Sequence, residues 1–284
     1  MFHLLKKEDN ISSYAATKKF AKENNIIKIG HSGTLDPLAS GYLLLADGDD
    51  TKLFNYVHDK SKKYHVVCAL GFQTDTFDIE GKVINRSTKK CNSQQEILKI
   101  VEIIKKNDYQ KPPIFSAKKI NGQKAYNLAR KGHKVVLDPV KIKIHSVTNV
   151  NLNVEKQIVS FDAHVSNGTY IRSIVNDLGL ELGTYATMTA LDRYEISGLS
   201  GNLTHFQIIN ILFKDRLIFT TKDDVIRLQK NHFNHIVKLS WYLDIINTEK
   251  DYILVDKDTN MCYGVISVAN KLIKIKRLFG KRLQ

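Results

Sequence analysis

The residues whose types and spacing could do chemistry are concentrated in one glycine-rich segment. Residues 28–41 read KIGHSGTLDPLASG, with three glycines and a proline directly after Asp36. Pro37 disfavours the helical conformation at Asp36 and holds it extended, while the glycines permit backbone angles that a Cβ would block. A carboxylate on a stiff loop is aimed before substrate arrives, which suits catalysis. An aspartate before proline also caps turns, and by residue type alone that is the simpler interpretation.

The elements that must position this loop include several strands. A short strand over Ile26–Ile29 is expected to lead into the loop, and buried or alternating patterns predict strands over 63–70 and 158–165. Beyond residue 230 the composition shifts to short alternating segments, at 252–255 and 272–276. These segments predict a small β-rich terminal domain that docks on the main body, because so short a unit is marginal alone.

Two helices are predicted between the strands. Ser93 and Glu96 have the spacing of a capping box, and apolar residues at helical spacing follow them to residue 104. A second helix is predicted after Gly168, ending at Gly179 or Gly183. Helices and strands without a regular βαβ rhythm indicate an α+β fold.

Composition narrows the function classes. The 284 residues include 43 Lys and Arg against 29 Asp and Glu, a net charge of +14. Such an excess favours a polyanionic partner, although the abundance of Lys, Ile and Asn also fits an AT-rich genome. Three separated cysteines have no metal-ligand or disulfide spacing. The N-terminus becomes charged too early for a signal peptide, and no apolar run could span a bilayer, so a cytoplasmic protein is expected.

Four blocks of the sequence resemble, in order and spacing, those of TruB-type pseudouridine synthases. The loop is similar to the signature GH[TS]G-x-LDP-x-A-[TS]-G. The second block has KKY at 62–64, LG at 70–71 and TDTFDIEG at 74–81, and the third is PPIFSAKKINGQKAYNLAR at 112–130. The fourth is SNGTYIRS at 166–173, with DLG at 177–179 and LDR at 191–193. The resemblance runs from residue 3 to about residue 200.

The resemblance implies a pseudouridine synthase fold with a mixed, mainly antiparallel sheet and a small β-rich, PUA-like C-terminal domain. It implies isomerisation of a uridine in the T arm of tRNA, at position 55, to pseudouridine. Such enzymes flip the base into a pocket, break the N-glycosidic bond and join C5 to the ribose, with no cofactor and no metal. Asp36 falls on the family's catalytic aspartate. Whether this carboxylate attacks the sugar, attacks the base or removes the ribose C2′ proton stays open.

The resemblance also places two further catalytic residues. Arg172 falls on the arginine that pairs with the aspartate, where a guanidinium favours the ionised carboxylate and fixes its direction. Its residue type equally allows a phosphate contact or a surface ion pair. Tyr64 matches the tyrosine that stacks on the target base and is a candidate for taking a proton, although a tyrosine in a strand is more commonly core.

Three more residues are assigned to the base pocket. Leu191 matches an apolar residue that lines the uracil site, and Tyr170 is expected beside it. His31 resembles the histidine that fills the space left by the flipped base, offsetting a cost of a few kcal/mol. Without the resemblance Leu191 would simply be core, and His31 could bond its own loop backbone.

Two tracts are basic with no acidic residue. Residues 109–137 hold seven Lys or Arg with interleaved aromatic residues, which suits an insertion around 105–138 that contacts RNA. The expected substrate contacts there are Lys118, Lys119, Lys124 and Arg130. Residues 270–284 are basic too, where the family carries the domain that grips the acceptor stem, although a solvated strand face would look the same. The expected domains are 1–230, catalytic, and 231–284, RNA-binding.

The sequence departs from the family pattern at KEDNISS, residues 7–13, where the usual motif is K-P-x-G-x-[ST]-S. This puts the loop path in doubt more than the reaction. Alternative functions are a non-catalytic RNA-binding or tRNA-folding protein, a guide-RNA-directed pseudouridine synthase subunit, and a retaining glycosidase with a second carboxylate from the TDTFD block. The intact pocket set favours an enzyme. The short chain favours a stand-alone monomer that acts on tRNA, with no membrane partner.

Overall fold

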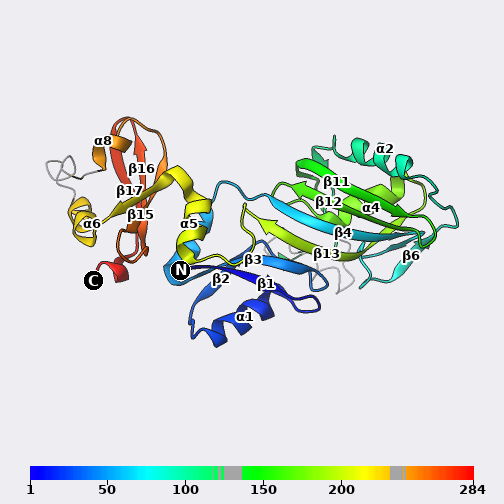
Figure 1. The fold of residues 1–284 in the computed structure, drawn as a ribbon, viewed down its shortest axis with the longest axis horizontal. Helices are drawn as coiled ribbons and strands as arrows, with labels where there is room; N and C mark the ends of the chain where they lie inside the picture. Colours follow the sequence, from blue (N-terminus) through cyan, green and yellow to red (C-terminus); the bar gives the residue numbers. More distant parts are fainter. Residues whose placement is uncertain (117, 121–122, 125–135, 231–238, 240) are drawn as a thin grey trace.

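The main body is built on one seven-stranded sheet, in the order β1-β3-β13-β4-β12-β11, with β2 also paired to β3 (Figure 1). The computed structural model describes residues 1–116, 118–120, 123–124, 136–230, 239 and 241–284, with the backbone alone at 119–120 and 123–124. Neighbouring strands are antiparallel except β13 and β3, which are parallel. The α+β fold with a mixed, mainly antiparallel sheet is therefore confirmed. The strands are β1 Phe2–Lys7, β2 Ile29–Ser32, β3 Ser40–Asp47, β4 Lys62–Leu70, β11 Ile144–Asn153, β12 Ile158–Val165 and β13 Ala186–Ile196.

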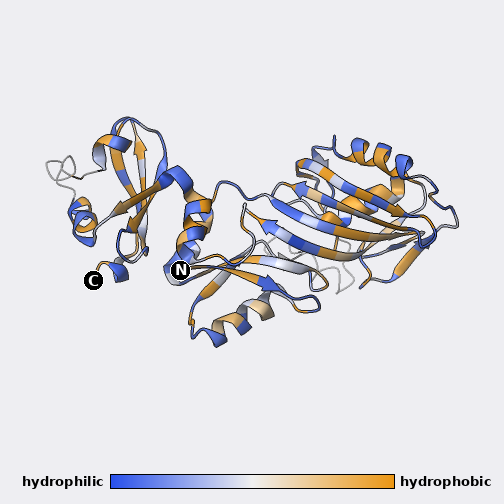
Figure 2. Cartoon of the chain, viewed as in Figure 1, coloured by the Kyte–Doolittle hydropathy of each residue, from blue (hydrophilic) through white to orange (hydrophobic). Residues whose placement is uncertain are grey.

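Two helices cover one face of this sheet. They are α2, Gln94–Ile104, and α4, Ile171–Glu181, and they pack against each other and against β11 and β13. Their apolar stripes enter a core that also holds the inward residues of β4 and β12. Figure 2 shows the resulting alternation of hydrophobic and hydrophilic residues along the strands. A third helix, α1, Ser13–Glu23, lies against β1 and β2.

The strands predicted over 63–70 and 158–165 and both helices are confirmed, with local corrections. The capping box does not form, because the Ser93 side chain makes no cap hydrogen bond and Glu96 instead accepts from the Cys91 thiol at 3.6 Å. Helix α4 ends before Gly183, whose φ is +67°. Gly179 lies inside that helix, where a Cβ would come within 2.1 Å of the Ala186 nitrogen.

The strand expected over Ile26–Ile29 was wrong in its bounds. Strand β2 begins at Ile29 and continues to Ser32, because its pairing with β3 places Ile29 opposite Asp47 and Ser32 opposite Leu44. Ile27 is fully exposed before the strand starts. His31 is consequently a strand residue rather than a loop residue.

The C-terminal part forms a second sheet of four strands, in the order β14-β15-β16-β17. Strands predicted at 252–255 and 272–276 are confirmed, while β14 lies before residue 230 and pairs in parallel with β15. A shared core of buried residues, among them Phe2, Leu44, Ile253 and Phe279, joins this sheet to the main body. The elements are α5 His205–Phe213, β14 Leu217–Thr220, α6 Lys222–Gln229, α8 Tyr242–Ile245, β15 Asp251–Asp256, β16 Cys262–Ala269 and β17 Leu272–Leu278.

Short elements complete the fold. Among the described residues, no helix has the length and apolar character to cross a membrane. Three pairs of short strands are β5 Phe72–Thr74 with β6 Val83–Arg86, β7 Tyr109–Gln110 with β10 Val140–Lys141, and β8 Lys119–Ile120 with β9 Gln123–Lys124. The 3₁₀ helices are η1 Gly48–Tyr56, η2 Lys214–Arg216 and η3 Gly280–Arg282.

Candidate active site

The loop that carries Asp36 connects β2 to β3 and is anchored on both sides of the aspartate. Leu35 and Leu38 are 3% and 9% exposed and belong to the main core. The Ser13 hydroxyl donates to the Leu35 carbonyl at 2.9 Å and accepts from the Leu35 amide at 2.8 Å. Because its apolar neighbours are buried, Asp36 is left on the open side of the loop, with 34% of its side chain exposed. The sequence therefore fixes the carboxylate by burying what surrounds it.

The buried Lys7 anchors the same loop by a hydrogen bond to its backbone. Lys7 is 1% exposed, and its ammonium donates to the carbonyls of Glu8 and Ile11, each at 2.7 Å, and of Pro37 at 3.1 Å. Burial lowers the pKa of Lys7. The ammonium thus ties the end of β1 to the residue after Asp36, although the usual Pro and Gly of this segment are missing from the sequence.

Arg172 meets Asp36 from the first turn of α4. Its Nη2 donates to Asp36 Oδ1 at 3.1 Å, and its Nε lies 2.8 Å from Oδ2. Only 6% of the Arg172 side chain is exposed, and further donors reach the carbonyls of Thr76 and Phe115, each at 3.0 Å. Because these two carbonyls hold the guanidinium in place, its edge of Nε and Nη2 is directed at the two oxygens of the Asp36 carboxylate. The structure therefore brings together the two residues that the resemblance paired.

A second carboxylate shares this guanidinium. Asp78 Oδ2 lies 3.4 Å from Arg172 Nη1, and Asp78 Oδ1 accepts from the Thr76 hydroxyl at 2.6 Å and from the Glu80 amide at 3.1 Å. Asp78 is 3% exposed, and this burial raises its pKa. The sequence interpretation named its block only as a possible source of a second carboxylate. The structure places it beneath Arg172 and closed to solvent.

Tyr64 and Leu191 lie on neighbouring strands in one buried cluster. Tyr64 on β4 is 6% exposed and Leu191 on β13 is 7% exposed, and both belong to the cluster that contains Leu35. Directly opposite Tyr64 in the register stands Arg193. Burial raises the pKa of the Tyr64 phenol, while Arg193 acts in the opposite direction and Asp36 adds to the rise. Tyr64 is therefore electrostatically coupled to both Asp36 and Arg193.

His31 contributes an unpartnered nitrogen to the site. It lies on β2 opposite Leu45, and its Nδ1 is buried without a hydrogen-bond partner. Burial, and secondarily the charge of Arg193, lower the pKa of His31, so the neutral ring is favoured. The alternative that this histidine bonds its own loop backbone finds no hydrogen bond at Nδ1.

The other residues predicted to contact the substrate are Tyr170, Lys118, Lys119, Lys124 and Arg130, and the structure shows no contact between them and Asp36 where it describes their side chains. Tyr170 is half-buried directly before α4, and its amide and carbonyl are both bound by the Gln110 side chain, at 2.8 and 3.1 Å. The Lys118 ammonium donates to the Asp138 carbonyl at 3.0 Å. Lys119 and Lys124 stand opposite each other in the β8–β9 pair. Their side chains, and the whole of Arg130, lie outside the described residues.

Two buried cations near the loop were not singled out by sequence reasoning. Arg193 is fully buried, and Lys62 is 8% exposed. A Cβ on Gly33 would lie 3.0 Å from Lys62 Cε and 3.4 Å from Arg193 Nη1, so both side chains pack beneath the same glycine. Burial lowers the pKa of Lys62 to about 8. Both residues occur in the family blocks, but residue type alone predicts exposed lysines and arginines.

Other polar clusters of the described chain have structural partners. Asp50, His205 and Cys262 approach with metal-like spacing. However, His205 Nδ1 accepts from the Phe2 amide, and Asp50 receives both outer nitrogens of Arg282, at 2.8 and 3.2 Å. A coordinating group would have to displace these bonds, so the cluster does not fit a metal.

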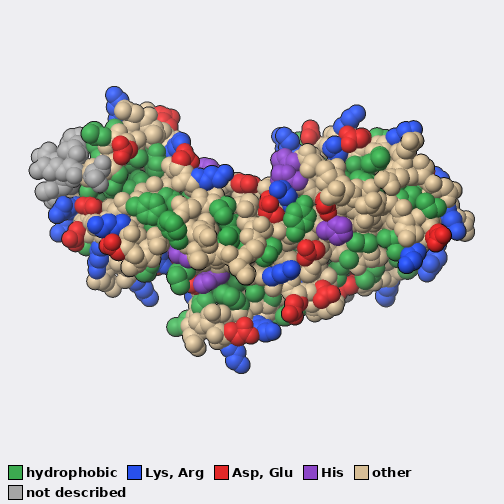
Figure 3. Space-filling model, viewed as in Figure 1, with side chains coloured by type: hydrophobic (Ala, Val, Ile, Leu, Met, Phe, Trp, Pro, Cys, Tyr) green, Lys and Arg blue, Asp and Glu red, His purple; other side chains and the backbone are tan. Residues whose placement is uncertain are grey.

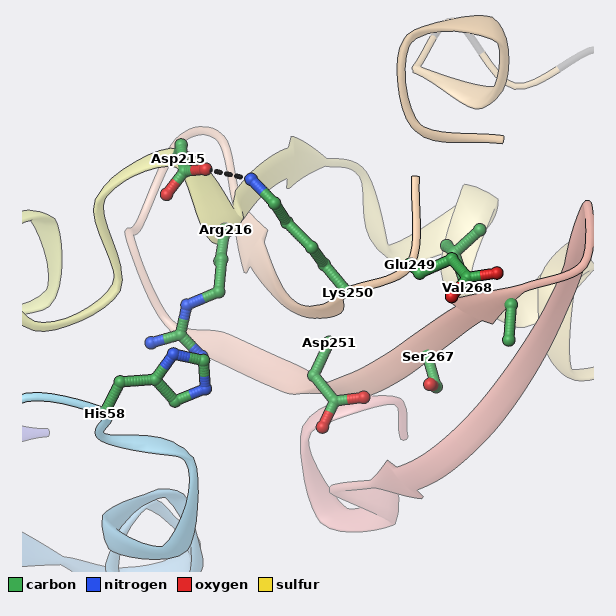
Figure 4. Close-up of a pocket in the computed structure, with 9 residues that line it drawn as sticks. His58, Asp215, Arg216, Glu249, Lys250, Asp251, Ser267 and Val268 are labelled. Atoms are coloured by element: carbon green, nitrogen blue, oxygen red, sulfur yellow. Dashed lines mark hydrogen bonds and ion pairs between the residues drawn. The ribbon is translucent and has the colours of Figure 1, made fainter. Parts of the chain in front are cut away.

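The surface is hollowed between the two sheets on the face shown in Figure 3, where Lys and Arg are interspersed with Asp and Glu. A pocket at the junction is lined by residues from the segment before β4, from η2 and from β15 and β16 (Figure 4). Its Arg216 donates to the Tyr56 carbonyl at 2.9 Å, and its Lys250 pairs with Asp215. The two cations of the pocket thus already have partners within the protein, and none of the residues that contact Asp36 lines this pocket.

Comparison with known proteins agrees with the geometry. Residues 18–171 match the family model for the N-terminal domain of TruB family pseudouridylate synthase. The tRNA pseudouridine synthase B of Mycoplasmopsis pulmonis is 40% identical over 288 residues, and that of Mycoplasma mobile is 37% identical over 284 residues. Each alignment covers 100% of this chain and 96% of the relative.

Solved structures share the fold. A chain of a Cbf5-Nop10-Gar1 complex aligns over 98% of this chain and 84% of its own length, with a TM-score of 0.64 and 16% identity. A chain of an H/ACA RNP bound to a substrate RNA containing 2′-deoxyuridine aligns over the same shares, with a TM-score of 0.57 and 16% identity. From the family match and the full-length relatives, the chain belongs to the TruB family of pseudouridylate synthases.

Proposed function

We propose that this protein isomerises a uridine in the T arm of tRNA to pseudouridine, with Asp36 as the catalytic carboxylate. The observation that carries the proposal is the open carboxylate of Asp36, which is bonded by a buried arginine and set beside a buried tyrosine and leucine. The full-length relatives named tRNA pseudouridine synthase B supply the substrate class.

The reaction exchanges one bond of the uridine for another. The bond from N1 to C1′ breaks, the bond from C5 to C1′ forms, the hydrogen on C5 leaves and N1 gains one, so product and substrate are isomers. An ionised carboxylate at Asp36 serves any of three routes, namely attack on the sugar, attack on the base, or removal of the C2′ proton. Arg172 keeps that carboxylate oriented, because two backbone carbonyls hold its guanidinium still.

The base must leave its stack to reach Asp36. Flipping costs a few kcal/mol, and the neutral ring of His31 on β2 is suited to fill the vacated space. Tyr64 and Leu191 supply an aromatic face and an apolar wall for the uracil, with Tyr170 beside them. In this proposal the tract around 105–138 and the C-terminal sheet hold the T arm and the acceptor stem. The protein acts as a monomer in the cytoplasm.

The glycosidase alternative is disfavoured by the second carboxylate. A retaining glycosidase needs two carboxyl groups about 5 Å apart on either side of the scissile bond. Asp78 is buried, and its oxygens are held by Arg172, Thr76 and the Glu80 amide. It cannot flank a sugar without breaking that network. The solved structures from H/ACA complexes share only the fold at 16% identity, whereas the tRNA enzymes match over the full chain.

The test is the Asp36→Asn variant on one unmodified tRNA transcript. We expect no pseudouridine, because the amide cannot act as nucleophile or base, and nearly unchanged tRNA binding, because the substitution keeps the size and shape of the side chain. Conversion is measured by mass spectrometry after derivatisation, and binding by filter retention. Asp59→Asn, outside the site, is the matched control. Conversion by Asp36→Asn at the wild-type rate would remove the catalytic assignment.

A further inference from the structure

We propose that Arg193 is a positioning residue for Tyr64: its guanidinium orients the phenol oxygen and stabilises the tyrosinate form that accepts the proton from C5. The inference rests on the proposed function, in which the C5 hydrogen must be removed. It goes beyond that function by assigning to Tyr64 a dedicated partner.

The sheet register places the two residues together. Arg193 on β13 is the direct antiparallel partner of Tyr64 on β4. Directly opposed residues on neighbouring antiparallel strands project to the same face, with Cβ atoms about 5 Å apart. On its other side β13 touches β3 so closely that a Cβ on Gly41 would lie 2.3 Å from the Arg193 carbonyl oxygen. Arg193 therefore has little freedom to move away from Tyr64.

One nitrogen of the Arg193 guanidinium, Nη1, has no hydrogen-bond partner. The Nε of Arg193 donates to the Tyr42 carbonyl and its Nη2 to the Gly33 carbonyl, both at 2.8 Å. Its Nη1 is buried and forms no aligned hydrogen bond. Among the described residues, the carboxylates of the site pair with Arg172 and none pairs with Arg193. Burying a cation without a counterion is costly, so negative charge formed next to it is strongly favoured.

Tyr64 is the group that can carry this charge. Its phenol is buried, which raises its pKa, and the charge of the neighbouring Arg193 guanidinium opposes the rise. Arg172 is bound to two carboxylates and two carbonyls and has no donor to spare. The tyrosinate becomes a neutral tyrosine when it takes the C5 proton. It becomes a tyrosinate again when that proton is passed on to N1 of the released base, so the cycle needs no other reactant.

A purely structural role for Arg193 would give a different result. In that case the arginine would only link the loop at Gly33 to β3 at Tyr42, and its loss would lower stability without changing the titration of Tyr64. Arg216 provides the matched control, because it is also buried, donates to the carbonyls of Tyr56 and Leu212, and contacts no tyrosine hydroxyl.

The first experiment reads Tyr64 directly in the free protein. With 3-fluorotyrosine at position 64, whose phenol ionises at lower pH than that of tyrosine, ¹⁹F NMR follows the titration of this one residue. We expect Arg193→Gln to raise the midpoint by about one pH unit or more, Arg193→Lys to raise it less, and Arg216→Gln to leave it unchanged. An unchanged midpoint in folded Arg193→Gln would overturn the proposal. If that variant does not fold, the charge-retaining Arg193→Lys decides, because loss of the fork geometry alone must still move the midpoint.

The second experiment reads the reaction. In single turnover on the tRNA transcript, Arg193→Gln should move the rising limb of the pH–rate profile to higher pH. The rate at neutral pH should then fall about tenfold for each pH unit by which the limb moves. An equal loss at every pH would contradict the assignment. If the wild-type protein makes no pseudouridine, the proposed function fails, while the ¹⁹F titration still decides whether Arg193 controls Tyr64.

Discussion

Lys62 should make the stability of this protein increase with pH in a defined window. Its ammonium is 8% exposed, donates to Asn167 Oδ1 at 2.8 Å and to the Lys60 carbonyl at 3.1 Å, and has a pKa lowered from 10.5 to about 8, chiefly by burial and then by Arg193. Below pH 8 both the folded and the unfolded chain carry the charge. Between pH 8 and 10.5 the folded chain has released the proton and the unfolded chain keeps it, so stability rises with pH.

The size of this effect follows from the two pKa values. The difference between 10.5 and about 8 corresponds, at 1.36 kcal/mol per pH unit, to about 3 kcal/mol. Lys62→Met keeps a side chain of similar length and removes the titration. We therefore expect the wild type to gain about 3 kcal/mol relative to Lys62→Met between pH 7 and pH 10.5.

The assay is urea unfolding at a series of pH values, followed by circular dichroism. Lys63→Met is the matched control, because the adjacent Lys63 is 35% exposed and pairs with Glu195 at 3.1 Å near the surface. The free energy of unfolding of the Lys63→Met variant should change with pH in parallel with that of the wild type, because Lys62 is intact in both. Parallel curves for Lys62→Met and wild type between pH 8 and 10.5 would refute the reasoning, since they would mean that Lys62 titrates as it does in the unfolded chain.

Two further changes test the packing that supports the site. Gly41→Ala should destabilise the fold by about 3 kcal/mol, because φ is +112° and the new Cβ would lie 2.3 Å from the Arg193 carbonyl oxygen. The control is Gly48→Ala, where φ is +51° and a Cβ would have no atom within 4 Å. This variant should cost about 1 kcal/mol. Equal losses for the two variants in urea unfolding would contradict the contact. Arg282→Ala should cost about 3 to 5 kcal/mol, because it removes the bidentate partner of Asp50, which is 1% exposed. Arg282→Lys should retain part of this stability in the same assay. A loss under about 1 kcal/mol for Arg282→Ala would show that the N-terminal ammonium, 2.8 Å from Asp50 Oδ2, is a sufficient partner for this carboxylate.

Regular elements were predictable because their burial follows a local period. Strand β12 matches its predicted bounds, since every second side chain from Val159 to Val165 is buried. The capping box at Ser93 does not form: the Ser93 side chain makes no cap hydrogen bond, and Glu96 accepts from the thiol of Cys91, which the capping-box spacing does not include. Strand β2 shifted, because its bounds depend on pairing with β3 and not on its own residues.

The sequence by itself predicted the loop that carries Asp36 and the stiffness of that loop. Two apolar residues flank Asp36 and Pro37 in this stiff segment, which favours burial of the leucines and exposure of the aspartate. The resemblance to the family blocks then singled out Asp36, Arg172 and Tyr64 as one site. Only the tertiary structure decided that Arg193, Lys62 and Lys7 are buried, because a basic side chain is placed in the interior by strand register and by carbonyls from distant segments. Those contacts leave no periodic signal, since each depends on where the rest of the chain folds.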